Sequence, residues 1–203
     1  DYVYLCFDVN EETLPAAVAG LKTCGIRGFN LTMPNKNKIV ELLDELSPEA
    51  QLIGAVNTVL NDNGKLIGYN TDGYGFMQSV RDAGHDITGK NITVMGVGGA
   101  SMAICAQSAL DGAASVHIFA RRTSRYWNRT QKFAENLSAK TGCQVCLFDN
   151  DDHTALRDSI AQSYLLINAT SVGMVPDIDD TIIKDTSLFH PELVVADVVY
   201  EPQ

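Results

Sequence analysis

The sequence has few basic residues and no long apolar run. Lys and Arg together number 15 against 25 Asp and Glu, so the formal net charge of the 203 residues is −10. This balance disfavours binding to nucleic acid or an anionic membrane through a basic face, because neutralising phosphates requires clustered Lys and Arg. No apolar run approaches the roughly 20 residues of a membrane span, and the start of the chain has no signal-peptide pattern. We therefore expect a soluble, cytoplasmic protein without nucleic-acid or membrane partners.

Cysteine is also sparse, and its number is odd. The five cysteines are Cys6, Cys24, Cys105, Cys143 and Cys146. An odd number scattered through apolar segments disfavours a disulfide framework. Cys143 and Cys146 have the spacing of a metal-binding pair, but no second pair or His lies near them in the sequence to complete a site. We expect both to be small core side chains and predict no metal.

The first third of the chain mixes strand and helix patterns. Strands are predicted at 2–9, 26–32, 55–60 and 65–69, and helices at 11–24, 35–46, 47–54 and from 71 to about 83. The turn Asn61–Gly64 joins the last two strands as a hairpin. A polar connector, Gly84–Lys90, follows the last helix, and we assign residues 1–72 to a first α/β domain.

From Asn91 onward, strands and helices alternate regularly. Strands are predicted at 91–95, 115–120, 144–149, 165–168 and 194–199, and helices at 100–110, 129–140 and 153–162. Repeated βα units with right-handed crossovers predict an open, doubly wound parallel sheet. We assign residues 73–203 to this second domain.

A glycine loop lies at the start of this alternation. The short run Ile92–Val94 stops at Gly96-Val97-Gly98-Gly99 and passes into a helical stretch, which is the context of a dinucleotide-binding loop. Glycines let the backbone turn sharply and let a pyrophosphate approach it, and the amides of the helix N-terminus then face that anion. Ser101 occupies the third small position of the pattern. The alternative is a glycine turn that only joins a strand to a packing helix.

The end of the second strand of this domain indicates which dinucleotide is bound. NAD-selective folds carry an acid there that holds the ribose hydroxyls. Here Arg121, Arg122 and Arg125 follow the strand instead, and a guanidinium pairs well with a 2′-phosphate. The sequence therefore favours NADP over NAD, the alternative being a basic turn without a ligand.

Two charged side chains lie at strand-to-helix junctions of the first domain, where ligands bind in open α/β sheets. Lys36 follows Gly28–Asn35, and Asp72 follows Gly68–Thr71. Taken alone, Lys36 is typical of a solvated lysine in a first helical turn, and Asp72 of an acid at a helix N-terminus. Their role depends on the other motifs.

Taken together, these motifs resemble the shikimate dehydrogenase family, including its quinate/shikimate branch. The resemblance covers nearly the whole chain and rests on motifs in the family's order and spacing, namely 28–36, 54–58, 68–73, 96–101, 168–174 and 197–202. It implies a substrate-binding α/β domain followed by a Rossmann-type cofactor domain. It also implies reversible, NADP-linked reduction of 3-dehydroshikimate to shikimate in aromatic amino-acid biosynthesis.

The resemblance also implies roles for individual residues. Lys36 and Asp72 would be the catalytic pair. The residues bordering the substrate would be Thr32, Lys36, Asn57, Asp72 and Tyr200. Pyrophosphate, adenosine-phosphate and nicotinamide-side contacts would come from Gly96, Val97, Gly98, Gly99, Ala100, Arg121, Arg122, Thr170 and Met174. An ammonium at position 36 can stabilise the oxyanion that forms on hydride transfer and then protonate it.

The sequence departs from the family pattern at several points. Ala120 stands where the family usually has Asn, and Asn35-Lys36 is similar to the quinate/shikimate branch, some of whose members accept NAD. We expect the family's serine pair to precede Asp1, and its substrate-binding Gln and closing helices to follow Gln203. The alternatives are a quinate or dual-specificity dehydrogenase and a non-catalytic nucleotide-binding regulatory module. We expect a monomer or a homodimer.

Overall fold

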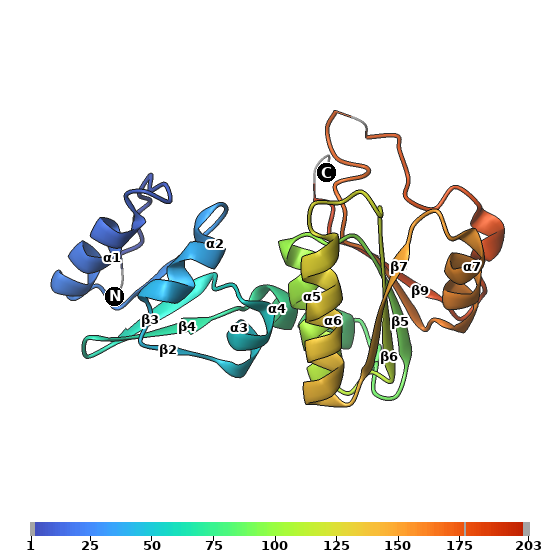
Figure 1. Ribbon diagram of the computed structural model, residues 1–203, viewed down its shortest axis with the longest axis horizontal. Helices are drawn as coiled ribbons and strands as arrows, with labels where there is room; N and C mark the ends of the chain where they lie inside the picture. The colour runs from blue at the N-terminus through green and yellow to red at the C-terminus, as the bar shows by residue number, and fades with distance from the viewer. Residues whose placement is uncertain (1–2, 177, 201–203) are drawn as a thin grey trace. The chain divides into compact units, whose positions relative to one another are not determined.

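The computed structural model describes residues 3–176 and 178–200. The chain divides into two compact units, Asp1–Thr71 and Asp72–Gln203, and each has its own sheet. Helices and strands occur in both units, which confirms the predicted α/β class (Figure 1). Within the described residues, no helix is both long and apolar enough to cross a membrane.

The first unit is built on a mixed sheet of strand order β1-β3-β4-β2. Its elements are α1 (Leu14–Thr23), β1 (Gly28–Asn30), α2 (Asn35–Lys38), the 3₁₀ helix η1 (Ile39–Leu42), β2 (Glu45–Leu46), α3 (Pro48–Ile53), β3 (Thr58–Asp62) and β4 (Lys65–Tyr69). β3 and β4 pair antiparallel around the predicted turn, which confirms the hairpin. α3 also follows its prediction, since the Ser47 hydroxyl accepts the Ala50 N–H and Gly54 ends the helix at φ 68°.

Two predictions in the first unit are wrong. Residues 3–9 form no strand, and residue 2 lies outside the described residues. A strand requires a paired neighbour, and Val3, Tyr4 and Phe7 are instead more than 60% exposed. The helix predicted at 35–46 ends at Leu42, because Glu45–Leu46 pairs parallel with β4 as β2.

Helices and sheet of the first unit enclose a small apolar core. Its buried members are Leu14, Val18, Ile39, Ala50, Val56, Val59 and Leu66. They come from α1, η1, α3, the two hairpin strands and the segment before β3, so the core joins every layer of this unit. The core therefore holds Ile39, which directly follows α2, and the segment around Val56, and predicted site residues lie beside both.

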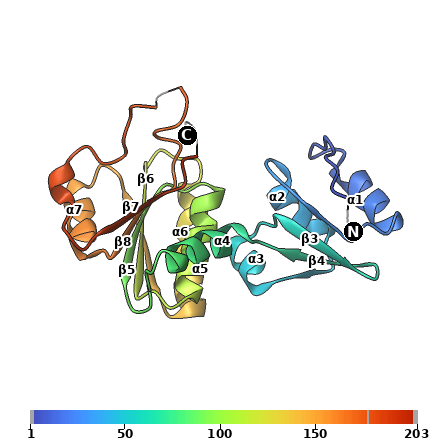
Figure 2. The ribbon, with the colours of Figure 1, turned by 180° about the vertical axis from the view of Figure 1, so that it is seen from behind.

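The second unit is a parallel sheet of strand order β7-β6-β5-β8-β9. Its elements are α4 (Asp72–Asp82), β5 (Asn91–Met95), α5 (Gly99–Leu110), β6 (Ser115–Ala120), α6 (Trp127–Thr141), β7 (Gln144–Asp149), α7 (His153–Gln162), β8 (Leu165–Asn168), the 3₁₀ helix η2 (Thr186–Leu188) and β9 (Val194–Asp197). Figures 1 and 2 show α5 and α6 on one side of this sheet and α7 on the other. The predicted doubly wound arrangement is thus confirmed.

Two of the cysteines are buried in the second unit. Cys105 on α5 and Cys143 before β7 are both buried, and every cysteine among the described residues is a free thiol. Burial raises the pKa of the Cys105 thiol to about 12 and that of Cys143 to about 11. Cys146 is half-buried on β7. The two buried thiols therefore act as small apolar core groups.

Candidate functional site

The glycine loop connects β5 to α5 at the carboxyl edge of the second unit's sheet. Gly96 has φ +107°, and a Cβ there would lie 2.8 Å from the Ala169 carbonyl oxygen. The Gly96 N–H donates to the Phe119 carbonyl at 2.8 Å, and the Ser101 hydroxyl donates to the Gly96 carbonyl at 2.6 Å. The first turn of the loop is therefore fixed by its own neighbours and requires glycine.

The rest of the loop is open. Gly98, Gly99 and Ala100 are exposed, and a Cβ added at Gly98 or Gly99 would meet no atom of the described chain within 4 Å. Gly98 is the N-cap of the 12-residue α5 and has no side chain to satisfy the first amides. The protein's own packing does not require glycine at these two positions, whereas an anion approaching the helix N-terminus does. The residues present thus fit a pyrophosphate.

The arginine turn follows β6, which lies beside β5 with Phe119 opposite Met95. Arg121 and Arg122 are both exposed. The Arg122 guanidinium lies 4.7 Å from the centre of the Trp127 ring, and this stacking limits the orientations of its plane. Two guanidiniums therefore lie at the same sheet edge as the open glycine loop, a suitable place for a phosphate on an adenosine ribose.

The loop after β8 reaches the glycine loop from the other side. The Ala169 N–H donates to the Met95 carbonyl at 2.9 Å, so Thr170 begins this loop directly beside Gly96. The Thr170 hydroxyl donates to the Asn168 side-chain oxygen at 2.7 Å and accepts the Val172 N–H at 3.0 Å. These hydrogen bonds fix the backbone conformation of the first residues of this loop.

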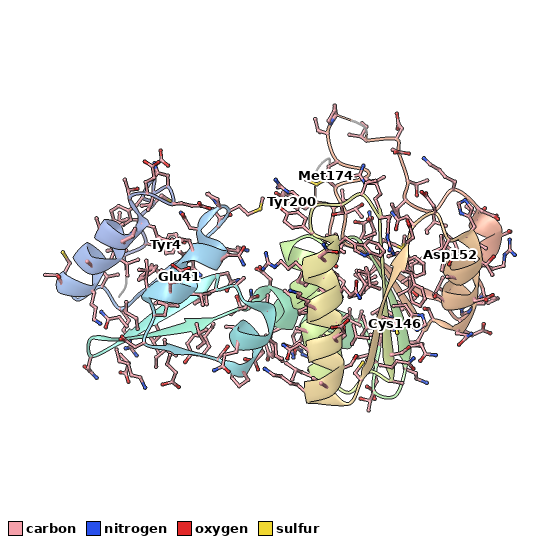
Figure 3. All side chains as sticks on the ribbon, viewed as in Figure 1. Tyr4, Glu41, Cys146, Asp152, Met174 and Tyr200 are labelled. Carbon is pink, nitrogen blue, oxygen red and sulfur yellow. The ribbon has the colours of Figure 1, made fainter. Side chains whose placement is uncertain are left out.

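Met174 and Tyr200 belong to neighbouring segments of the same sheet edge. Met174 is half-buried in the loop after β8, and Tyr200 follows β9 and is 69% exposed. Figure 3 shows both side chains at the same end of the second unit. β8 and β9 pair in parallel, so the loops that follow them leave the sheet together. Every cofactor residue predicted in this unit thus lies at the carboxyl edge of three adjacent strands.

Lys36 lies in the first unit, as the second residue of α2. It is half-buried, and its carbonyl accepts the Val56 N–H at 2.8 Å, which ties the start of α2 to the segment before β3. Thr32, in the turn before α2, is exposed, and its carbonyl accepts the Asn35 N–H at 3.0 Å. Lys36 and Thr32 are therefore carried by one turn beyond the end of β1.

Asn57 is 8% exposed, and its side chain is hydrogen-bonded to Thr71, the last residue of the first unit. Its side-chain NH₂ donates to the Thr71 hydroxyl at 3.0 Å, and its oxygen accepts the Thr71 N–H at 3.0 Å. The Leu31 N–H donates to the Asn57 carbonyl at 2.8 Å. Asn57 thus links the segment before Thr32 to the residue that precedes Asp72, the first residue of α4.

Sequence reasoning assigned no role to several polar side chains of these loops. Asn168 and Asp197 end β8 and β9 and bond to each other at 3.0 Å. The signal that finds them is the register of two parallel strands, which places their last residues opposite each other. The contact of Thr71 with Asn57 and that of Trp127 with Arg122 were not predicted either, because each of these residues acts by holding another site residue. Among the described residues, no group of three or more His, Cys, Asp or Glu is placed to hold a metal ion.

Comparisons with known proteins cover the whole chain. A family profile described as the shikimate dehydrogenase substrate binding domain matches residues 1–59. A shikimate dehydrogenase (NADP(+)) from Listeria innocua is 48% identical over 202 residues, which are 100% of this chain and 69% of that protein.

Two solved structures are also similar. Shikimate 5-dehydrogenase from Listeria monocytogenes, in complex with shikimate and NAD, has a TM-score of 0.97 at 48% identity and covers 100% of this chain and 70% of that one. Quinate dehydrogenase from Corynebacterium glutamicum, in complex with NAD, has a TM-score of 0.80 at 30% identity and covers 93% of this chain and 64% of that one.

Proposed function

Because the chain belongs to the shikimate dehydrogenase family, we propose that it catalyses the reversible, NADP-linked reduction of 3-dehydroshikimate to shikimate. The observation that carries this proposal is the sheet edge of the second unit. There the open glycine loop, the arginine turn and the loop after β8 end three adjacent strands, as a dinucleotide requires. The 48% identity to a relative named shikimate dehydrogenase (NADP(+)) supports the choice of substrate and cofactor.

We assign substrate binding and cofactor binding to different parts of the chain. Residues 1–72 would form the substrate-binding and catalytic domain, which the family profile matched over residues 1–59 supports. Residues 73–203 would form the cofactor domain. In it, Gly96, Val97, Gly98, Gly99 and Ala100 would hold the pyrophosphate, Arg121 and Arg122 the adenosine phosphate, and Thr170 and Met174 the nicotinamide side.

The bound nicotinamide supplies the hydride in the reductive direction. Lys36 is assigned to the carbonyl oxygen of the substrate, where an ammonium stabilises the growing negative charge and then donates a proton from Nζ. Asp72 is assigned to orient this ammonium and to accept a hydrogen bond from a substrate hydroxyl. Thr32, Asn57 and Tyr200 are assigned to the remaining polar groups of the substrate.

The test is turnover by the intact protein with shikimate and, separately, quinate, each offered with NADP and with NAD. Lys36→Ala should lower kcat by about two orders of magnitude or more with little change in the dissociation constant of NADP, since it removes the proton donor only. Lys38→Ala is the matched control. Lys38 lies in the same short helix, but it is exposed and pairs with Glu41 at 2.7 Å, so its loss should leave kcat unchanged.

The outcomes separate the alternatives. Faster oxidation of quinate would favour the second candidate function, a quinate or dual-specificity dehydrogenase, which the similarity to a quinate dehydrogenase of known structure supports. Tight NADP binding without turnover of either compound would favour a non-catalytic nucleotide-binding module. Equal kcat for Lys36→Ala and the wild type would remove Lys36 from the catalytic role.

Two further assignments accompany this proposal. We infer a cytoplasmic enzyme, as the composition led us to expect, and a monomer or homodimer. Light scattering on the purified chain decides the oligomeric state, and cell fractionation decides the location.

A further inference from the structure

β8 and β9 end side by side, and their last residues are joined by their side chains. Asn168 stands opposite Asp197 in the parallel register. The Asn168 amide donates from Nδ2 to Asp197 Oδ2 at 3.0 Å, and Asn168 is only 9% exposed. The Asp197 carboxylate is itself exposed, and its bond to the buried Asn168 amide fixes one of its two oxygens.

Asn168 uses its whole hydrogen-bonding capacity in this position. Its Oδ1 accepts both the N–H and the hydroxyl of Thr170, at 3.1 and 2.7 Å. Its second amide hydrogen is directed to the Val172 carbonyl, at 3.2 Å. One side chain therefore shapes the first residues of the loop that carries Thr170 and Met174.

Asp197 shapes the neighbouring segment in the same way. Its Oδ1 accepts the Val199 N–H at 2.7 Å, while its Oδ2 accepts from Asn168. Val199 immediately precedes Tyr200. The bond between Asn168 and Asp197 is thus a side-chain link between the loop after β8 and the segment after β9, in addition to the backbone bond from the Val198 N–H to the Asn168 carbonyl at 3.0 Å.

We propose that Asn168 and Asp197 are a pair of positioning residues that sets the nicotinamide-side loop, with Thr170 and Met174, against the substrate-side segment, with Tyr200. This inference rests on the proposed function, which assigns those three residues their ligands. Hydride transfer depends steeply on the distance between donor and acceptor, so an error of about 1 Å in one loop costs up to about 100-fold in rate. The pair acts by holding these two contact groups in one register.

The first test is a reciprocal exchange. Asn168→Asp places two carboxylates against each other, and Asp197→Asn removes one of the two acceptors that the Asn168 and Val199 donors use. Each single variant should lose about tenfold or more in kcat. In N168D/D197N an amide again faces a carboxylate, Thr170 and Val199 keep their acceptors, and only the Val172 carbonyl loses its donor. The double variant should therefore recover most of kcat.

The matched control is Asn91→Ala, at the opposite edge of the same sheet. Asn91 also joins two elements, since its Oδ1 accepts the Ser115 hydroxyl at 2.9 Å and its Nδ2 donates to the Gln162 carbonyl at 3.3 Å. Its loss should lower the urea midpoint of unfolding and leave kcat unchanged. If the single variants at 168 and 197 behave like Asn91→Ala, the pair is only structural and the inference fails.

The second test does not need turnover. Hydrogen exchange of the ligand-free chain reads the Val172 amide, which Thr170 holds, and the Val199 amide, which Asp197 holds. Asp197→Asn should accelerate exchange at Val172, in the other loop, by about tenfold, and N168D/D197N should reverse this. Acceleration at Val199 alone would overturn the inference. If the wild type turns over no substrate, the proposed function fails, and exchange alone decides whether the pair couples the two loops.

Discussion

At the scale of single residues, two glycines of the loop after β5 serve different purposes. Gly96 combines φ +107° with a Cβ position 2.8 Å from the Ala169 carbonyl, so its lack of a side chain is a requirement of the fold. Gly98 has φ −79°, and its Cβ position is open as far as the described residues reach. Substituting alanine at Gly96 therefore tests the requirement of the fold, and substituting it at Gly98 tests ligand binding.

Gly98→Ala should leave the free energy of unfolding within about 0.5 kcal/mol of the wild type. The new methyl occupies the space that a pyrophosphate requires, so the dissociation constant of NADP should rise at least about tenfold. Gly96→Ala should instead cost about 1–3 kcal/mol in unfolding free energy, because it adds backbone strain and a clash. Urea unfolding and NADP titration measure the two effects. Unchanged NADP affinity in Gly98→Ala would contradict the assigned pyrophosphate site.

His117 makes stability depend on pH. It lies on β6, its Nδ1 is 2.9 Å from the Ser159 hydroxyl, and its ring packs edge-on against Phe148 at 5.2 Å. Burial lowers the pKa of His117, because the charged form loses hydration. The unfolded chain therefore takes up this proton first as the pH falls. The contribution of His117 to stability is complete above its ordinary pKa near 6.5 and is lost as the pH falls through its lower folded pKa.

The check compares urea midpoints at pH 7.5 and 5.5. His117→Gln keeps a polar partner for Ser159 but cannot take up a proton, so the variant should lose less stability on acidification than the wild type does. His153→Gln, at the exposed start of α7, is the control and should keep the wild-type pH dependence. An equal loss of stability in His117→Gln and the wild type would remove His117 as the cause.

At the scale of elements, α4 and α5 pack closely at one glycine. A Cβ at Gly73 would lie 2.2 Å from the Ala103 carbonyl oxygen, whereas a Cβ at Gly75, two residues further along α4, would meet nothing in the described chain within 4 Å. Arg81 and Asp111 add an ion pair of 2.6 Å between the end of α4 and the residue after α5. The start of α4, which carries Asp72, is thus held against α5 by a contact that only glycine permits.

Alanine at these two positions should have opposite effects. Gly73→Ala should destabilise the protein by about 1–3 kcal/mol, because the backbones must separate. Gly75→Ala should stabilise it by about 0.5–1 kcal/mol, since alanine is the better residue in an exposed helix interior. Thermal and urea unfolding of both variants give the sign of each change. A neutral Gly73→Ala would mean that α4 does not need this close approach.

The regular elements of the second unit were predictable because each one shows its own period. β5, β6, β7 and β8 have the predicted bounds, since each is a short, mostly apolar run that alternates with a helical segment. The errors lie where pairing between distant segments decides. Residues 43–46 follow a helical period, but the Asp44 carboxylate accepts the Leu66 N–H at 2.8 Å and β2 joins the sheet. No local pattern contains that partner.

The same contrast between local motifs and long-range pairing applies to the candidate site. The glycine loop and the arginines could be proposed from sequence because each belongs to a short local motif, whereas Lys36 received its role only from the resemblance of several motifs to one family. Asn168 and Asp197 were in the quoted motifs but received no role, because their bond joins positions 29 residues apart. Side chains that position other side chains become visible only once the strand register is known.

At the scale of the whole molecule, each unit has its own hydrophobic core and one optical probe distinguishes them. The chain has a single tryptophan, and Trp127 lies in the second unit, 8% exposed at the start of α6. The first unit's core is a small cluster around α1 and the hairpin. Separate cores allow separate unfolding transitions, since contacts within a unit are what make its unfolding cooperative.

Unfolding in urea should therefore differ between tryptophan fluorescence, which reports the second unit, and circular dichroism, which reports both. NADP at about 100 times its dissociation constant should stabilise the fluorescence transition by about 2.7 kcal/mol, because it binds only the folded cofactor domain. The part of the dichroism change that fluorescence does not follow should stay at the same urea concentration. Gly98→Ala, tested at the same NADP concentration, should show a smaller shift. A single transition that both probes follow, shifted as a whole by NADP, would contradict the assignment of cofactor binding to residues 73–203 as an independent folding unit.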